Sequence, residues 1–268
     1  MKTVKENGQL AVVAKRQLAK LGTDEKNNIL AVCAKALRDN AEFIVGENAK
    51  DMENAKNNNM PQGLQDRLML NVDRVNAMAE GLELIEKLPD PIGEVLDMRT
   101  LPNGLTVGQK RVPMGVIGII YEARPNVTSD AFGLCLKAGS AVILRGGSDA
   151  IYSNIATVSV FRKAIEDLGY NPDFVQLVED TTRASSTEMM TLNDYIDLLI
   201  PRGGKGLIQS VVKNATVPVI ETGVGNCHIY MDESGKIDDG VNIIVNAKAQ
   251  RVGVCNAAET LLVHKNIA

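Results

Sequence analysis

The chain has 268 residues, at the upper limit of one hydrophobic core and near the length of two domains, with 45% hydrophobic and 23% charged residues. These fractions exclude intrinsic disorder, which requires low hydrophobicity and a high net charge. The formal net charge of −4 and the few aromatic residues (four Phe, five Tyr and no Trp) give neither a basic field for phosphates nor a stacking platform for single strands, so we expect no nucleic-acid partner.

Residues 1 to about 88 predict a helical lead-in. Gly22 ends the first helix, and the run 23–26 opens the second with a capping-type signal. Apolar residues recur at helical spacing in both helices, at Leu10, Val13, Ala14 and Leu18 and then at Ile29, Leu30, Cys33 and Leu37. This part carries no recognisable chemistry, and we expect it to pack on the segments that follow.

Two strand-like runs, 95–101 and 105–112, follow the helices and are separated by Pro102-Asn103-Gly104. Asn-Gly between two such runs favours a hairpin with a type I′ turn, in which φ is positive at both central residues. We expect this hairpin to project from the body of the protein.

From Met114 onward the pattern changes to alternating strands and helices. The clearest helix is 150–168, which ends at Gly169. Short continuous apolar strands separated by helices are typical of a parallel sheet that is covered on both faces, here a doubly wound α/β domain. Ligands of such sheets bind outside the carboxyl ends of the strands. The five expected strands are 116–121, 141–145, 174–177, 195–200 and 217–221.

The loops that leave four of these strands carry the candidate chemistry. Three of the four combine clustered glycines with a nearby cation, which suits a phosphate bound by backbone N–H groups at helix N-termini. Standard fingerprints are absent, because Gly223-Val224-Gly225 is followed by His228 where a dinucleotide motif needs glycine, and Lys205 lacks the Walker A context. For any single loop, glycines that only make a tight turn remain the alternative interpretation.

The four cysteines, Cys33, Cys135, Cys227 and Cys255, lack the C-x-x-C spacing of zinc or redox sites. The set Cys227, His228, Cys255 and His264 matches no standard zinc pattern either, and we expect no metal site. No signal-peptide stretch and no apolar run of about 18 residues is present, so we expect a cytoplasmic protein with reduced thiols and no membrane contact.

Cys255 is the candidate nucleophile. It follows a helical run that ends near Ala249, and it lies beside Gly253 with Arg251 close by. A neighbouring cation lowers the pKa of a thiol, and the thiolate is the nucleophilic form. On the residues alone, a buried structural cysteine is the favoured alternative.

Several strings resemble the aldehyde dehydrogenase superfamily. The string 113–120 resembles the first strand of its nucleotide-binding domain, and 137–145 resembles the second, with Arg145 where the superfamily usually has Lys. The string 221–225 stands where its Glu-Leu-Gly-Gly string is expected, and 253–255 loosely resembles its Gly-Gln-x-Cys nucleophile element.

Three further strings, 121–128, 225–228 and 251–256, are similar to the γ-glutamyl phosphate reductase branch of that superfamily. The resemblance implies an aldehyde dehydrogenase-like α/β fold: a Rossmann-like, doubly wound parallel sheet with the helical lead-in, the projecting hairpin and the start of a second α/β domain. It implies a nucleotide-binding domain over 1–225, including the lead-in 1–88 and an oligomerisation-type hairpin at 95–112. Residues 226–268 would then be the N-terminal part of an incomplete catalytic domain.

The resemblance also implies a reaction: NADPH-dependent reduction of γ-glutamyl phosphate to glutamate 5-semialdehyde with release of phosphate, the second step of proline biosynthesis. Cys255 would form a thioester, and Asn126 with the Cys255 N–H would stabilise the oxyanion. Arg124 and Arg251 would hold the substrate. Cofactor contacts would come from Arg145, Gly203, Gly204, Lys205, Glu221 and Gly223.

Arg145 near the ribose would favour the 2′-phosphate of NADPH. Glu221 would lie beside the nicotinamide, because a reductase must avoid hydrolysing its thioester. His228 is expected to be structural.

Partners implied by the resemblance are the small-molecule substrate, further copies of the full-length protein in a homo-oligomer, and glutamate 5-kinase. Two other functions remain open. One is a nucleotide-binding or assembly fragment without catalytic activity. The other is a thiol hydrolase with a histidine base, which is weakened because neither His228 nor His264 has a recognisable acidic partner.

Overall fold

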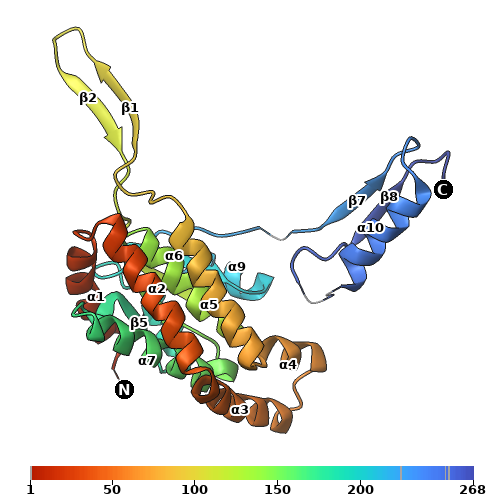
Figure 1. Cartoon of the computed structure of the whole chain (residues 1–268), viewed down its shortest axis with the longest axis horizontal. Helices are drawn as coiled ribbons and strands as arrows, with labels where there is room; N and C mark the ends of the chain where they lie inside the picture. The colour runs from red at the N-terminus through yellow and green to blue at the C-terminus, as the bar shows by residue number, and fades with distance from the viewer. Residues whose placement is uncertain (1, 224, 251, 253) are drawn as a thin grey trace. The chain divides into compact units, whose positions relative to one another are not determined.

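The computed structural model describes residues 2–223, 225–250, 252 and 254–268. Its contacts divide the chain into two units, one that ends at Glu221 and one that runs from Thr222 to Ala268 (Figure 1). No helix in these described ranges is long and apolar enough to cross a membrane.

The predicted helical lead-in is confirmed. Its first helix begins at a capping box, in which the Thr3 hydroxyl accepts the Glu6 N–H at 3.2 Å and the Glu6 carboxylate accepts the Thr3 N–H at 2.7 Å. The second helix packs against the fifth and against a later helix of the sheet domain (Figure 1). The lead-in helices are α1 (Val4–Leu18), α2 (Thr23–Asp39), α3 (Ala41–Asn57), α4 (Gln62–Leu68) and α5 (Val72–Lys87).

The start of α2 differs in one detail from the sequence prediction. Gly22 is the N-cap, and its N–H donates to the Glu25 carboxylate at 2.8 Å. The Thr23 hydroxyl donates to Asp90 at 2.8 Å, and Lys26 Nζ pairs with the same carboxylate at 2.6 Å. The capping signal therefore also ties α2 to the segment that follows α5.

The predicted hairpin is confirmed, but its turn is not type I′. Strand β1 (Val95–Thr100) pairs antiparallel with β2 (Thr106–Lys110), and every residue of both strands is exposed. Leu101 N–H donates to Leu105 O at 2.8 Å, which leaves a loop of three residues. Only Gly104, with φ of 84°, has positive φ there. The expectation of positive φ at Asn103 is wrong, because the third loop residue relieves that requirement.

The predicted parallel sheet is confirmed, and its strand order is β5-β4-β3-β6. Strand β3 pairs with β4 on one edge and with β6 on the other, so the chain order reverses at β3. The elements are β3 (Val116–Tyr121), α6 (Pro125–Lys137), β4 (Ala141–Arg145), the 3₁₀ turn η1 (Ser148–Ala150), α7 (Ile151–Asp167), the 3₁₀ turn η2 (Pro172–Phe174), β5 (Val175–Leu177), α8 (Arg183–Met190), β6 (Leu198–Arg202) and α9 (Lys205–Asn214).

Both faces of the sheet are buried, as continuous apolar strands require. Ile117, Ile119 and Tyr121 of β3 belong to one core cluster, with side chains of α2, α5, α6 and α7. Val116 and Ile120 belong to the other, with side chains of α1, α8 and α9. The alternation along β3 is the period of two that places successive side chains on opposite faces.

The fifth expected strand, 217–221, is wrong. Residues 217–221 pair with the sheet only through an isolated bridge between Leu199 and Val219. Leu199 N–H donates to Pro218 O at 2.8 Å, but Pro218 has no N–H to continue a ladder. The expected strand 195–200 also starts late, at Leu198, because the Tyr195 and Ile196 N–H groups are bonded to Leu192 O in a turn.

The second unit is a small βαβ arrangement. Strand β7 (His228–Met231) pairs parallel with β8 (Thr260–Val263), and α10 (Ile237–Ala249) connects them. None of its described helix residues is buried.

We predict that Asp90→Ala lowers the free energy of unfolding by about 3 kcal/mol, because it leaves the ammonium of Lys26, whose side chain is only 2% exposed, without its carboxylate and with only the Lys137 carbonyl oxygen as a partner. Lys35→Ala, which removes an exposed pair with Asp39, should cost under about 1 kcal/mol. Urea unfolding of both variants measures the difference. Equal losses would contradict a stabilising role for the buried pair.

The same pair predicts a pH dependence. Burial alone would raise the pKa of Asp90, but the hydrogen bonds from Lys26, the Ile92 N–H and Thr23 hold that pKa below its ordinary value. A lowered folded pKa gives stability that is present above about pH 3.9 and is lost as the pH falls through the folded pKa. Unfolding below pH 4 should therefore depend less on pH in Asp90→Ala than in the native chain.

Candidate active site

The candidate site in the first unit lies where β3, β4 and β6 end. Their last residues are Tyr121, Arg145 and Arg202, so the loops that follow leave from one edge of the sheet. The reversal of strand order at β3 makes this edge the expected position of a ligand crevice.

Glu122 joins two of these loops. Its N–H donates to Arg202 O at 3.2 Å, and its carboxylate accepts the Gly204 N–H at 2.9 Å. A Cβ at Gly203 would lie 2.7 Å from the Glu122 Cδ, so only glycine allows this approach without a shift. Gly203, Gly204 and Lys205 are exposed, and Gly204 is the N-cap of α9.

A carboxylate therefore occupies the N-terminus of α9, and the same is true of α7. Asp51 of α3, which is 1% exposed, accepts the Tyr152 N–H at 3.2 Å and the Ser153 N–H at 2.8 Å. Burial raises the pKa of Asp51, while these N–H donors oppose the rise. At each of these two helix N-termini, a carboxylate of this chain thus accepts at least one backbone N–H.

Arg145 is a largely buried residue. Its Nη2 donates to Thr181 O at 2.6 Å and to Thr182 O at 2.9 Å. Its Nε has no partner among the described residues. Burial lowers the pKa of this guanidinium, and Asp180 opposes that effect. In this arrangement Arg145 ties the end of β4 to the loop after β5.

A buried polar network supports the same edge. The Tyr121 hydroxyl lies 2.7 Å from Thr128 Oγ1, and the Thr128 hydroxyl donates to Asn154 Oδ1 at 2.8 Å. The Thr128 hydroxyl has one proton and donates it to Asn154. The Tyr121 hydroxyl must therefore be the donor in its bond with Thr128. The network connects β3, α6 and α7, and thus the bases of the loops that carry Glu122 and Asn126.

Asn126 is exposed on the first turn of α6, and its Nδ2 donates to Asp130 Oδ2 at 3.2 Å. Burial raises the pKa of Asp130, while the Asn126 hydrogen bond and the charge of Arg202 lower it. Arg124 is the half-buried N-cap residue of α6. Arg124 and Asn126 therefore lie at the start of α6, directly after the loop that leaves β3.

Cys255 belongs to the second unit and is exposed, in a turn where the Ala257 N–H donates to Val254 O at 3.3 Å. The alternative of a buried structural cysteine is therefore wrong for Cys255, although it holds for Cys33 and Cys135. Asn126 and Cys255 lie in different units, so a contact between them stays a prediction.

Two of the remaining expected residues, Glu221 and Gly223, lie at the division between the units, and both are exposed. His228 is the first residue of β7, and its Nδ1 lies 2.9 Å from Asn226 O. Arg251 lies outside the described residues, as does Gly253 of the nucleophile string. Within the described ranges, no cluster of His, Cys, Asp and Glu side chains is placed to hold a metal ion.

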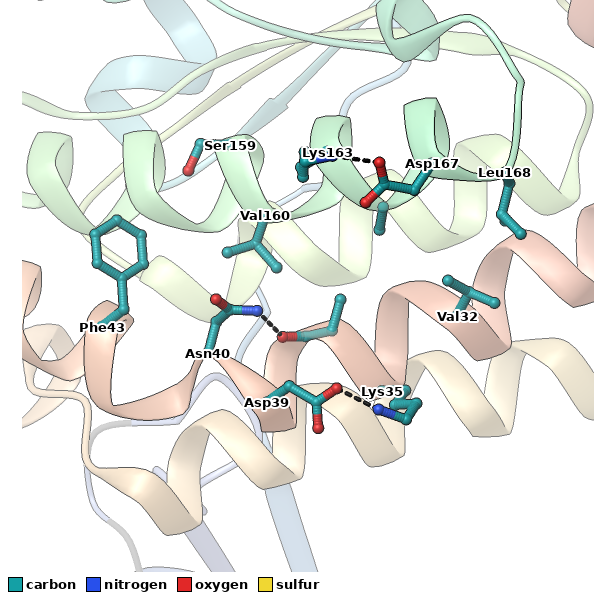
Figure 2. A pocket seen from close by; sticks show the side chains of 12 residues that line it. Val32, Lys35, Asp39, Asn40, Phe43, Ser159, Val160, Lys163, Asp167 and Leu168 are labelled. Atoms are coloured by element: carbon teal, nitrogen blue, oxygen red, sulfur yellow. Dashed lines mark hydrogen bonds and ion pairs between the residues drawn. The ribbon is translucent and has the colours of Figure 1, made fainter.

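A groove of about 550 Å³ lies elsewhere in the first unit, between α2, the start of α3 and the last turns of α7. Figure 2 shows its apolar floor at Val32 and Val160 and the two ion pairs on its rim, Lys35 with Asp39 and Lys163 with Asp167. None of the expected site residues lines it. Because α7 starts at the carboxyl edge of the sheet and runs back from it, this groove is not part of the candidate site.

The first unit contains a parallel sheet, and an exposed cysteine follows it in the second unit. The model of the aldehyde dehydrogenase family matches residues 1–268, and the chain belongs to that family. The predicted resemblance to the superfamily is thereby confirmed.

Within the family, the chain is similar to γ-glutamyl phosphate reductases. It is 56% identical to that of Lachnospira eligens over 100% of this chain and 65% of the relative, and 58% identical to that of Heliobacterium modesticaldum over 97% and 63%. The crystal structure of the Thermotoga maritima γ-glutamyl phosphate reductase matches with a TM-score of 0.90 at 45% identity, over 99% of this chain and 64% of that one. The chain thus spans less than two thirds of these relatives' length.

Sequence reasoning missed three residues that shape the site. Glu122 directly follows a predicted strand, so its position was a usable signal. Asp51 lies on the helical lead-in, and no local pattern indicates that it caps a helix 100 residues later. Asn154 resembles any polar residue on a helix until the fold places it beside Thr128.

We predict that Thr128→Val lowers the free energy of unfolding by about 3 kcal/mol, because the Tyr121 O–H and Asn154 Oδ1 both lose their buried partner. Thr128→Ser keeps the hydroxyl and should cost about 1 kcal/mol for the lost methyl group. Thermal or urea unfolding measures both. Equal losses in the two variants would show that the hydroxyl contributes nothing.

Proposed function

We propose that the protein containing this chain reduces L-glutamate 5-phosphate to L-glutamate 5-semialdehyde with NADPH and releases phosphate, the second step of proline biosynthesis. The observation that carries the proposal is 56% identity to a γ-glutamyl phosphate reductase along the whole chain, including the region of Cys255. Because the chain spans 65% of that relative, the activity is proposed for the whole protein.

The residues at the carboxyl edge of the sheet fit a dinucleotide. Gly203 and Gly204 expose their backbone at the strand-order reversal, and the exposed Lys205 adds a positive charge beside them. Glu221 and Gly223 would contact the nicotinamide end. NADPH, when bound, supplies the hydride. Any cofactor phosphate that takes the Gly204 N–H must displace the Glu122 carboxylate, which makes Glu122 a competitor for that position.

Cys255 would act as the nucleophile. Its thiolate would attack the acyl carbon, and the bond between that carbon and the phosphate oxygen would break, leaving a thioester. Splitting the reduction in this way replaces one difficult step with two easier ones. After hydride addition, the carbon–sulfur bond would break and release the aldehyde and the thiolate.

The oxyanion would be stabilised by the Cys255 backbone N–H and by Asn126. An amide NH₂ has two donors, and one of them is bonded to Asp130. That bond fixes which end of the amide carries the N–H groups and leaves a second donor for the oxyanion. Arg124 and Arg251 would hold the anionic groups of the substrate.

The full-length protein would form a homo-oligomer through the β1–β2 hairpin, whose exposed apolar side chains include Val95, Leu96 and Met98. Association with glutamate 5-kinase stays a prediction.

We predict that Cys255→Ala abolishes phosphate-dependent reduction of NADP⁺ by glutamate 5-semialdehyde, because it removes the thiol proposed to carry the acyl unit. Cys135→Ala, which alters a buried thiol of α6, should retain activity. Activity that survives Cys255→Ala would contradict the nucleophile role. Tight NADPH binding without activity in the native chain would favour a non-catalytic nucleotide-binding fragment.

A second variant tests Arg145. If its guanidinium serves the 2′-phosphate, Arg145→Ala should weaken binding of NADPH by a larger factor than binding of NADH, measured by fluorescence titration. Equal losses for the two cofactors would refute that role and leave Arg145 as the tie to Thr181 and Thr182.

A further inference from the structure

In the second unit, the thiol of Cys227 contacts the backbone of Cys255. Cys227 immediately precedes β7, and its Sγ lies 3.5 Å from the carbonyl oxygen of Cys255, to which the thiol donates. Cys227 is half-buried and Cys255 is exposed. The proposed reaction uses only the second of the pair.

Cys227 is held in place by the start of β8. Its carbonyl oxygen accepts the Glu259 N–H at 2.9 Å and the Thr260 N–H at 3.2 Å. Asn226 adds a side-chain contact, because the Thr260 hydroxyl donates to its Oδ1 at 3.3 Å. The position of the Cys227 sulfur beside the Cys255 segment is therefore fixed by backbone pairing.

The contact brings the two cysteines within reach of a disulfide after a local movement. A carbonyl oxygen lies about 2.4 Å from its own Cα and a cysteine Sγ about 2.8 Å from its own Cα by standard covalent dimensions, so the 3.5 Å contact limits the separation of the two Cα atoms to about 8.7 Å at most. A disulfide needs Cα atoms about 4.4–6.8 Å apart. Cys255 lies in an exposed turn between α10 and β8, so a local movement there can join the sulfurs while β7 and β8 stay paired.

The other two cysteines are poor candidates for oxidation. Cys33 and Cys135 are buried in the first unit, and burial raises the pKa of both thiols, that of Cys135 to about 12. Because the thiolate is the reactive form, neither should compete with the exposed pair. The chain thus has two buried thiols in the first unit and, in the second unit, the exposed thiol of Cys255 and the half-buried thiol of Cys227.

We propose that Cys227 is the resolving thiol of an oxidation site at Cys255, and that the oxidant is a hydroperoxide. The Cys255 thiolate attacks one peroxide oxygen, the O–O bond breaks, and the sulfur becomes a sulfenic acid while the leaving oxygen takes a proton. The Cys227 thiolate then attacks that sulfur, the S–O bond breaks, and hydroxide leaves and is protonated to water. Two thiols are oxidised to one disulfide, and hydrogen peroxide is reduced to two waters.

The disulfide keeps Cys255 from further oxidation to sulfinic acid, which thiols do not reverse. It also blocks the nucleophile reversibly. Only this second consequence rests on the proposed function, since formation of the bond needs no reductase activity.

The test treats the reduced whole chain with hydrogen peroxide, alkylates the remaining thiols and measures the intact mass and the peptides. We expect two fewer alkyl groups than in the untreated reduced chain and a cross-linked peptide pair that contains Cys227 and Cys255, both reversed when dithiothreitol is added before alkylation. Cys227→Ser should instead gain oxygen atoms on Cys255, and dithiothreitol should no longer restore its thiol after prolonged exposure. Cys135→Ala is the matched control and should form the disulfide as the native chain does.

The proposal is overturned if, in the native chain, Cys255 is oxidised while Cys227 remains fully available for alkylation. It is also overturned if dithiothreitol restores the Cys255 thiol of Cys227→Ser as completely as it restores that of the native chain. The mass measurement detects the disulfide independently of reductase activity, so the oxidation site and the proposed function are tested separately. A disulfide in a protein without reductase activity would refute the function alone, and activity without a disulfide would refute only the oxidation site.

Discussion

The parallel pairing of β3 with both β4 and β6 is the constraint on which the first unit depends. It pairs both edges of β3 and brings three strand ends to one edge of the sheet, where side chains from distant parts of the sequence meet, while the helices bury both faces of the strand. The Glu122 contact with Gly204 exists because β3 and β6 are neighbours. If β3 and β6 were not neighbours, the loops that carry Glu122 and Gly204 would not meet.

Carboxylates occupy backbone donors at two helix starts on this edge. At α7 the Tyr152 and Ser153 N–H groups are bonded to Asp51, and at α9 the N–H of the N-cap Gly204 is bonded to Glu122. A phosphate that takes any of these donors must compete with a carboxylate.

The sequence predicts elements whose determinants are local. Strands β3 and β4 have their expected bounds because they are continuous apolar runs between turn signals. The expected strand at 217–221 failed at Pro218, whose missing N–H is itself a readable signal. By contrast, the direction of the Arg145 guanidinium and the capping of α7 by Asp51 depend on tertiary contacts. A sequence pattern of glycines and cations cannot distinguish an exposed cation from a buried one that is bonded to backbone carbonyl groups.

We propose that the second unit carries the acyl group on Cys255 and that the first unit binds the cofactor. Incubation of the protein with glutamate 5-semialdehyde and NADP⁺ in the absence of phosphate, followed by an acid quench and peptide mapping by mass, tests this proposal. We expect a glutamyl thioester on the peptide that contains Cys255, and we expect phosphate added before the quench to remove it. If no acyl adduct forms, or if the adduct lies on a different residue, the proposal is wrong.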